Sequence, residues 1–431
     1  MTFYSLNNIA PKVSFKEAVI AGIAPDKGLY FPECITPLSN SFFENIKNYS
    51  NLEIAFKAIQ QFVGDEIPDK KLKKILVNVL DFKFPVVQIE ENVATLELFH
   101  GRTMAFKDVG ARFMADCLSY FSNDSNNEVT VLVATSGDTG SAVANGFIGV
   151  KGVKVVILYP KGKVSDIQER QLTTLGKNIT ALEVDGSFDD CQKMVKTAFL
   201  DPTLLNRMQL TSANSINVAR WLPQLFYFLF AYKQVKLLKK EIVFAVPSGN
   251  FGNICAGMVA QKLGMPVKHF VAATNVNNTV PEFMKTGKYK PKPSTATISN
   301  AMDVGDPSNF IRIRHLFKDD LTQISKQFSS YSFSDEATRQ AMKHLYKTSK
   351  YIADPHGAVG YLGLKKYQET QPNAYGIFLE TAHPVKFLEI VENVIPIKLE
   401  IPPQIKKVMN KEKKSIGIKT YENLKNFLIN N

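Results

Sequence analysis

The residues best suited to chemistry lie in the stretch 100–112, HGRTMAFKDVGAR, where one lysine follows an apolar pair at the expected start of a helix. Ala105 and Phe106 precede Lys107, and Asp108 follows it. Burial against apolar side chains disfavours the ammonium ion, and a neutral amine can attack a carbonyl carbon to form an imine. The stretch is therefore typical of a Schiff-base lysine, although a surface lysine at a helix start would have the same neighbours.

Two glycine-rich loops each follow an apolar, strand-like run. The first has the sequence SGDTG, and its Gly137 and Gly140 permit close approach of a ligand to the backbone. Ser136, Asp138 and Thr139 of this loop could contact a carboxylate or a ring hydroxyl. Taken alone, this motif is a weak signal.

The second loop, SGNFGN after Pro247, is the stronger signal for an anion. Glycines let successive backbone N–H groups converge, and the following helix N-terminus adds partial positive charge, which together suit a phosphate monoester. Ser248 and Asn250 could add side-chain donors. The run matches neither GxGxxG nor a Walker loop, so a dinucleotide or a nucleoside triphosphate is disfavoured. A turn that serves only the topology of the sheet is the alternative.

Apolar strands that alternate with helices must position both loops. In residues 91–235 the expected strands are Val129–Thr135, Val153–Tyr159 and Ile179–Val184. The expected helices of this part are Ser141–Phe147, Asp166–Leu175 and Phe188–Phe199. Continuous apolar strands separated by helices predict a parallel sheet that is covered on both faces.

A second series of strands and helices follows in residues 236–431. Its expected strands are Ile242–Val246, Val267–Ala273, Tyr351–Ala353 and Tyr375–Leu379. Its expected helices are Pro223–Lys239, which leads into the series, then Asn253–Leu263, Asp335–Thr348, Gly357–Tyr367 and one from Pro384. The fold class is therefore α/β, with two mostly parallel open sheets whose strand ends can form a ligand site.

The first part of the chain has a different character, since residues 1–90 predict a small, mainly helical N-terminal domain. Ser14 is the expected N-cap of a helix over Phe15–Ala21, and Asn51 is the expected start of an apolar-periodic helix that reaches Val63. We therefore expect three domains: residues 1–90, residues 91–235 with the lysine, and residues 236–431 with the phosphate loop.

Composition limits the class of protein. The chain has 431 residues, of which 45% are hydrophobic and 21% charged, as in ordinary globular proteins. The formal net charge is +12, but the lysines are scattered and accompany no nucleic-acid motif, so no nucleic-acid partner is expected. The four cysteines form no CxxC pair, which favours a reducing, cytoplasmic setting without bound metal. Signal-peptide and membrane-spanning patterns are not found, so no membrane is expected either.

Eight segments taken together resemble the signatures of a known family. They are HGRTMAFKDVGARFM, ATSGDTGSA, SANSIN, VPSGNFGN, AATNVNNTVP, SNAMDVGDPSN, DPHGAVGY and TAHPVKF. The family is threonine synthase, in the bacterial and fungal branch of the fold-type II pyridoxal-phosphate enzymes, whose fold is similar to that of the tryptophan synthase β chain. The resemblance covers essentially the whole chain, because VSFKEAV and GLYFP near the N-terminus are also similar to that branch.

The resemblance implies roles for individual residues. Lys107 matches the lysine that forms the Schiff base with pyridoxal 5'-phosphate and then shuttles protons. The residues that match the loop for the cofactor phosphate are Gly249, Asn250, Phe251, Gly252 and Asn253. Asp138 matches the position near the ring hydroxyl, and Thr381 matches the hydroxyl residue that faces the pyridine nitrogen. The residues that match the loop for the substrate carboxylate are Ser136, Gly137 and Thr139.

The implied reaction is that of a lyase, in which O-phosphohomoserine and water give L-threonine and phosphate by γ-elimination and β-addition. The candidates for binding the substrate phosphate are Arg112, Lys161, Lys163 and Arg220, each of which could instead be a surface charge. A phospho-lyase or dehydratase that uses the same cofactor and yields 2-oxobutyrate is an alternative, and so is a non-catalytic phosphate-binding protein. The expected assembly is a monomer or a homodimer.

One position departs from the family pattern, and two histidines lie near the expected site. Arg102 stands where the family usually has proline in HGPT, which puts the rigidity of that turn in doubt rather than cofactor binding. His100 and His383 flank the same group of residues, and a lone histidine is more often an orienting or core group than an acid or base.

Overall fold

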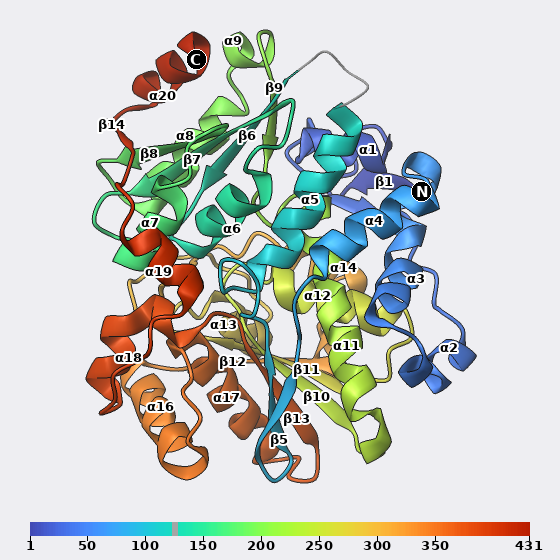
Figure 1. Cartoon of the computed structure of the whole chain (residues 1–431). Coiled ribbons are helices and arrows are strands. Elements are labelled where there is room, and N and C mark those ends of the chain that lie inside the picture. Colours follow the sequence, from blue (N-terminus) through green and yellow to red (C-terminus); the bar gives the residue numbers. More distant parts are fainter. Residues whose placement is uncertain (123–127) are drawn as a thin grey trace. The chain divides into compact units, whose positions relative to one another are not determined.

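The computed structural model describes residues 1–122 and 128–431 (Figure 1). The chain forms two compact units, each built from segments that are distant in sequence. The first unit consists of Met1, residues 31–106 and residues 221–400, and the second of residues 2–30, 107–220 and 401–431. These boundaries differ from the consecutive ranges 1–90, 91–235 and 236–431, because both ends of the chain add elements to the second unit.

The first unit is organised around a six-stranded sheet with the order β12-β11-β10-β13-β5-β4 (Figure 1). In that order the strands are Phe328–Ser332, His269–Thr274, Ile242–Pro247, Tyr375–Glu380, Val93–Glu97 and Val86–Glu90. Neighbouring strands run parallel, except that β4 is antiparallel to β5. All residues of β10, β11 and β13 are buried, which agrees with strands that are covered on both faces.

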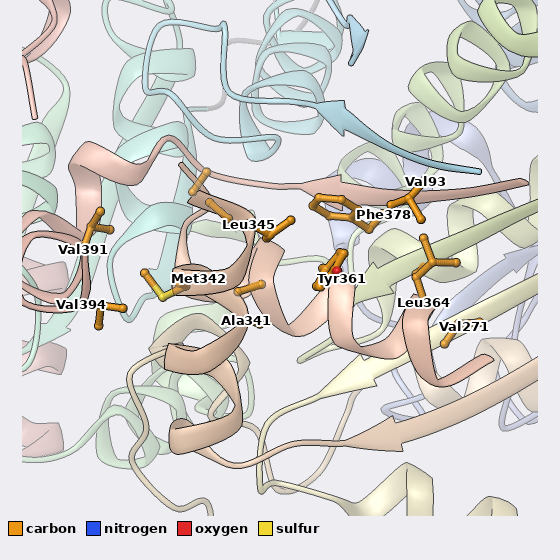
Figure 2. Close-up of a cluster of buried hydrophobic side chains, with 14 of the residues drawn as sticks. Val93, Val271, Ala341, Met342, Leu345, Tyr361, Leu364, Phe378, Val391 and Val394 are labelled. Atoms are coloured by element: carbon orange, nitrogen blue, oxygen red, sulfur yellow. The ribbon is translucent and has the colours of Figure 1, made fainter. Parts of the chain in front are cut away.

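Both faces of this sheet carry helices. Val243 and Ala245 of β10 belong to an apolar cluster that includes Leu364 of α17 (Pro355–Gln368). Figure 2 shows part of this cluster, to which Met342 and Leu345 of α16 (Asp335–Ser349) and Tyr361 and Phe378 also belong. Phe244, between the two residues of β10, contacts Phe228 of α11 (Leu225–Val235) instead. Alternate side chains thus pack on opposite faces.

The remaining elements of the first unit surround the sheet. The α-helices are α2 (Asn40–Glu44), α3 (Asn51–Val63), α4 (Asp69–Val79), α12 (Gly252–Lys262), α13 (Thr279–Thr286), α14 (Phe310–Leu316), α15 (Leu321–Gln327) and α18 (Leu388–Val394). Short 3-10 helices are η1 (Ile46–Asn48), η2 (Gly64–Glu66), η3 (Leu222–Gln224), η4 (Lys236–Leu238), η5 (Asn300–Met302) and η6 (Pro384–Phe387). The strand β3 (Tyr30–Pro32) spans the boundary between the units.

The second unit contains a five-stranded parallel sheet with the order β14-β8-β7-β6-β9. In that order the strands are Ile416–Ile418, Ile179–Val184, Val153–Pro160, Val129–Ala134 and Gln209–Ser212. Its helices are α1 (Phe15–Ala21), α5 (Lys107–Ser122), α6 (Asp138–Phe147), α7 (Asp166–Thr173), α8 (Phe188–Ala198), α9 (Pro202–Leu205), α10 (Val218–Trp221), whose last residue belongs to the first unit, α19 (Pro403–Met409) and α20 (Tyr421–Asn430). The hairpin of β1 (Thr2–Ser5) and β2 (Val13–Ser14) precedes α1.

Most expected elements are confirmed within a few residues. Ser14 caps α1 with a capping box, and α3 begins at Asn51, although Ser50 supplies its cap. The strand expected over Tyr351–Ala353 is wrong. Ala353 is buried in the core cluster of Figure 2, and the partly buried Tyr351 and Ile352 pack against that cluster, without pairing as a strand.

None of the described helices combines the length and the apolar character that a membrane span requires. The described part of the chain also holds no group of three or more His, Cys, Asp or Glu residues that could bind a metal ion.

Candidate active site

Lys107 is the first residue of α5 and belongs to the second unit. Its Nζ lies 3.9 Å from Oδ2 of Asp138, and its side chain is only 17% exposed. The Lys107 carbonyl accepts a hydrogen bond of 3.1 Å from Nη1 of Arg220. One turn later, a Cβ at Gly110 would lie 2.2 Å from the Arg220 carbonyl oxygen, so only glycine permits this approach of α5. The lysine is therefore held from its backbone and faces a buried carboxylate.

Asp138 is positioned by a loop that only glycine can form. Gly137 has a φ of +136° and precedes α6, and a Cβ there would lie 2.5 Å from Cδ of Gln168. Thr135 Oγ1 accepts hydrogen bonds from the backbone N–H groups of Gly137 and Gly140, at 2.9 and 2.8 Å. The SGDTG loop is thus tied to the end of β6, and its last three residues form the first turn of α6.

Gln168 is a functional candidate that the sequence analysis missed. Its Nε2 donates a hydrogen bond of 2.8 Å to Asp138 Oδ1, which leaves Oδ2 facing Lys107. Gln168 is fully buried in α7, and its Oε1 accepts from Ser165 Oγ at 3.0 Å. Gln168 and Gln171 are both buried and share one face of α7, and two glutamines three residues apart are the only sequence signal for this role.

Four basic residues were expected as candidates for a second anion, and the structure separates them. Lys161 and Lys163 are exposed after β7, whereas Arg112 and Arg220 are buried. Arg220 Nε donates to the Ala213 carbonyl at 2.7 Å, so this guanidinium serves the backbone. Burial lowers the pKa of Arg220 to about 10, although nearby Asp108 opposes the shift. Arg112 is the buried candidate on α5, and Ser136 and Thr139 are partly exposed at the start of α6.

The loop expected to bind phosphate, residues 248–253 (called the phosphate loop below), belongs to the first unit and follows β10. Ser248 Oγ donates to the Val246 carbonyl at 2.9 Å. We expected this hydroxyl as a possible donor to a phosphate, but its proton is engaged by the backbone. Phe251 has a φ of +61° at the start of α12, and its ring contacts Phe310. A Cβ at Gly249 would lie 2.8 Å from the Ala301 carbonyl oxygen, so the backbone of η5 packs directly against the loop.

An unpartnered donor lies beside this loop. Asn253, in the first turn of α12, is 7% exposed, and its Nδ2 is buried with no hydrogen-bond partner among the described residues. Its Oδ1 accepts from the Tyr227 hydroxyl at 2.7 Å, and burial raises the pKa of Tyr227 well above its usual value. A buried amide donor, the N-terminal amides of α12 and a glycine held against backbone are the donor set of an oxyanion site. These residues fit a phosphate group.

Thr381 and the histidines lie around the end of β13 in the first unit. The Thr381 carbonyl accepts from the Phe106 N–H at 2.9 Å, one residue before Lys107 in sequence. His383 Nδ1 accepts from the Val385 N–H at 3.1 Å, and burial lowers the pKa of His383 to about 4. His100 Nε2 lies 2.7 Å from Glu97 Oε2. Both histidines therefore have local hydrogen-bond partners, His383 in the backbone and His100 in the Glu97 carboxylate.

The turn that carries Arg102 is held by an exposed ion pair. Arg102 Nη2 lies 3.3 Å from Asp81 Oδ2, and its side chain is 57% exposed. Met104, two residues later, has a φ of +58°, so the turn contains a left-handed residue. The arginine that replaces the usual proline thus forms a surface ion pair.

Family models cover nearly the whole chain. The model of the pyridoxal-phosphate dependent enzymes matches residues 88–377. Together with the parallel sheets and the phosphate loop, this match defines a pyridoxal-phosphate enzyme of fold-type II. Models of the threonine synthase N terminus and of the threonine synthase C-terminal region match residues 2–79 and 357–428.

Full-length relatives narrow the class further. The chain is 44% identical to threonine synthase of Escherichia coli (strain K12), over 94% of each chain, and 35% identical to that of Saccharomyces cerevisiae, over 96% and 94%. The crystal structure of threonine synthase from Escherichia coli matches with a TM-score of 0.94 and 41% identity over 100% of both chains. The pyridoxal-phosphate-bound enzyme from Brucella melitensis matches with a TM-score of 0.93 and 30% identity, over 99% and 98%. The chain belongs to the threonine synthase family.

Proposed function

We propose that the chain converts O-phosphohomoserine and water into L-threonine and phosphate, as a lyase that depends on pyridoxal phosphate. The observation that carries this proposal is the full-length match to threonine synthases of bacteria and yeast. The ion pair of Lys107 and Asp138 and the oxyanion donor set at the start of α12 support it from the chain's own residues.

Two sets of residues would hold the cofactor. The backbone amides of residues 249–253, with Asn253 Nδ2, would bind its phosphate, and Lys107 would bind its aldehyde carbon. When bound, the cofactor supplies a ring that accepts the electron pair left when the α proton of an amino acid departs. Asp138 would lie near the ring hydroxyl. Thr381 would offer a neutral hydroxyl to the ring nitrogen, which leaves the ring less protonated than a carboxylate partner would.

The chain's own residues then bind the substrate and move protons. Ser136, Gly137 and Thr139, at the N-terminus of α6, would bind the substrate carboxylate, since amides there favour an anion. The Lys107 amine would take the α proton and help to relocate the β proton, which allows the γ phosphate to leave with its bonding pair. Water then adds its hydroxyl group at the β carbon and gives its proton to the released phosphate, and the two protons taken from the α and β carbons return to the α and γ carbons. Arg112 is the buried cation proposed to hold the phosphate of the substrate.

Product analysis tests the proposal. The purified chain with pyridoxal phosphate and O-phosphohomoserine should release threonine and phosphate in equal amounts. Release of 2-oxobutyrate in place of threonine would instead indicate a phospho-lyase or a dehydratase. Failure of borohydride to trap a lysine adduct would favour a non-catalytic phosphate-binding protein.

Lys107 provides the sharpest variant. Lys107→Ala should lower turnover by about 1,000-fold or more, because it removes both the imine and a positioned proton-transfer group. Lys107→Arg is the matched control, since it keeps a cation opposite Asp138 but cannot form the imine. Equal loss in both variants, with the borohydride adduct absent from both, is expected. Substantial threonine production by either variant would contradict the assignment.

Assembly and location are also proposals. We infer a monomer or a homodimer, which analytical ultracentrifugation of the purified chain distinguishes. A cytoplasmic setting is our expectation from the cysteine pattern, and the four cysteines, Cys34, Cys117, Cys191 and Cys255, are free.

A further inference from the structure

Two buried carboxyl groups meet in the first unit, at the end of β13 and the start of α17. Asp354 caps α17, Glu380 ends β13, and both are completely buried. Glu380 Oε1 accepts from the Asp354 N–H at 2.5 Å. The other oxygens, Glu380 Oε2 and Asp354 Oδ2, have no hydrogen-bond partner among the described residues. Two ionised carboxylates left in this way would be costly, because buried charges need partners.

His356 is not the missing cation. Its Nδ1 lies 2.5 Å from Asp354 Oδ1, and its Nε2 lies 3.2 Å from the N–H of Ala301. A backbone N–H can only donate, so Nε2 must accept and carries no proton. The ring is therefore the neutral tautomer that donates from Nδ1 to Asp354. A neutral ring does not balance the negative charge that two ionised carboxylates would carry.

Other titratable groups surround the pair without contacting its open oxygens. They are Glu97 on β5, Tyr351 before α17, Asp303 after η5, His383 at the N-cap of η6 and Lys386 in η6. The Tyr351 hydroxyl donates to Glu97 Oε1 at 3.1 Å, and Lys386 Nζ donates to the Thr103 carbonyl at 2.9 Å. Neither donor reaches Glu380 Oε2 or Asp354 Oδ2.

Close packing leaves little room for another partner at this point. A Cβ at Gly357 would lie 1.5 Å from Glu380 Oε2, so this oxygen sits directly over the Cα of a glycine. Burial, and after it the charge of Asp354, raises the pKa of Glu380 well above its usual value, and the two side chains are within hydrogen-bonding reach. A proton between the two open oxygens would give each of them a hydrogen bond.

We propose that Glu380 and Asp354 share one proton in the folded chain through their open oxygens, and that this leaves Asp354 Oδ1 as the acceptor for the His356 Nδ1–H, which orients the ring that holds η5 against the phosphate loop. His356 Nε2 accepts from the Ala301 N–H, and the Ala301 carbonyl packs against Gly249 of the phosphate loop. Glu380, Asp354 and His356 are thus positioning residues, not catalytic ones. Only the last link, from Gly249 to the cofactor phosphate, rests on the proposed function.

The first experiment measures the shared proton without any ligand. Glu380→Gln replaces the protonated carboxyl by an amide that can donate to Asp354 Oδ2 at every pH. In the wild type, the folded chain keeps a proton that the unfolded chain releases above the ordinary glutamate pKa of about 4.3. The stability of the wild type relative to Glu380→Gln should therefore fall as pH rises from about 5 to 8, as thermal unfolding measures.

Glu336→Gln is the control in the same thermal unfolding measurement. Glu336→Gln makes the same chemical change at an exposed site on α16, and its unfolding midpoint should follow the wild type at each pH. If the stability of the wild type relative to Glu380→Gln stays constant or increases as pH rises, the proposal is overturned. Should Glu380→Gln not fold, infrared spectroscopy of the wild type decides, since absence of a protonated-carboxyl band near neutral pH would also overturn it.

The second experiment measures the positioning of the phosphate loop. His356→Leu leaves the Ala301 N–H without its acceptor, so the dissociation constant for pyridoxal phosphate should rise about tenfold, as for one lost buried hydrogen bond. Binding of pyridoxal, which lacks the phosphate, should stay unchanged. An equal loss for both compounds would reject the link to the loop. The first experiment uses no ligand. A negative result there would reject the shared proton, whereas a failure to make threonine would reject the proposed function.

Discussion

At the scale of single residues, the chemistry proposed for Lys107 depends on how Asp138 is held. Asp138 has one oxygen bound to Gln168 at 2.8 Å and the other 3.9 Å from Lys107 Nζ. A carboxylate that is only 4% exposed needs such a donor to stay in one orientation. Gln168 thereby determines which oxygen the lysine faces, although it need not touch the substrate.

Removal of the Gln168 donor tests this arrangement. Gln168→Met keeps the length of the side chain but leaves a buried carboxylate oxygen without its partner, at a cost of about 1–3 kcal/mol. Turnover should fall about tenfold or more while the chain stays folded, as steady-state kinetics and circular dichroism measure.

A second substitution at the same position gives the matched comparison. Gln168→Glu keeps the shape but places a second carboxylate beside Asp138, so its loss of turnover should exceed that of Gln168→Met. Equal turnover in the wild type and in both variants would show that Asp138 needs no support from α7.

At the scale of elements, the strand–loop–helix from β10 to α12 builds the phosphate loop. The loop turns at Phe251, which has a left-handed conformation with a φ of +61° and directly precedes the first residue of α12. Gly249 lies against η5, where backbone atoms of Ala301 and Met302 leave no room for a side chain. Two elements that lie about 50 residues apart in sequence, α12 and η5, therefore shape one loop.

A single methyl group should disturb this loop. In Gly249→Ala the new Cβ would lie 2.8 Å from the Ala301 carbonyl oxygen and 2.9 Å from Met302 Cα, so η5 or the loop must move. Overpacking of this kind costs about 1–3 kcal/mol, and pyridoxal-phosphate affinity should fall about tenfold or more. Fluorescence titration with the cofactor measures the change.

Gly417→Ala is the control for that titration. Gly417 lies in β14 of the second unit, and a Cβ there meets nothing within 4 Å. This variant should bind the cofactor as the wild type does. Unchanged affinity in Gly249→Ala would mean that η5 does not constrain the loop.

At the scale of the whole molecule, the C-terminal segment completes the second unit. β14 pairs with β8, and Arg170 of α7 donates to the carbonyls of Met409 and Lys411 at 2.9 and 3.2 Å. Lys413 Nζ lies 2.8 Å from Asp166 Oδ1 and 2.6 Å from Glu169 Oε2, both on α7. The helix that carries Gln168 is therefore held by residues near the C-terminus.

The contribution of Lys413 should depend on pH. Burial opposes the shift, but Lys413 and Arg170 outweigh it and hold the pKa of Asp166 below its usual value. A depressed carboxyl pKa contributes stability above the unfolded value of about 3.9, and this contribution is lost as pH falls through the folded pKa. Lys413→Met should cost up to about 1 kcal/mol near neutral pH, because the Asp166 side chain is 52% exposed and solvent screens the pair, and nothing in acid.

Chemical denaturation at several pH values checks this expectation. Lys406→Met is the control, since Lys406 is an exposed lysine on the neighbouring α19. It should match the wild type throughout. A cost of Lys413→Met that persists below the folded pKa of Asp166 would contradict the ion-pair explanation.

Local sequence patterns predicted much of the fold. The capping box at Ser14 and the strand Ile179–Val184 were predictable because caps and apolar runs act over a few neighbouring residues. Tyr351–Ala353 was predicted wrongly because burial, not pairing, explains its apolar character. β12 was missed because its sequence, FSSYS, is mostly polar and only half-buried at the edge of the sheet.

The sequence by itself determined the fold class, the family and the positions of Lys107 and the two glycine loops, because these signals are contiguous and short. Only the tertiary structure decided that Gln168 holds Asp138, that Asp354 meets Glu380, and that both ends of the chain join the second unit. The physical reason is that these partners lie far apart in the chain. Hydrogen bonds between them exist only once strands have been ordered in a sheet, and no local periodicity specifies that order.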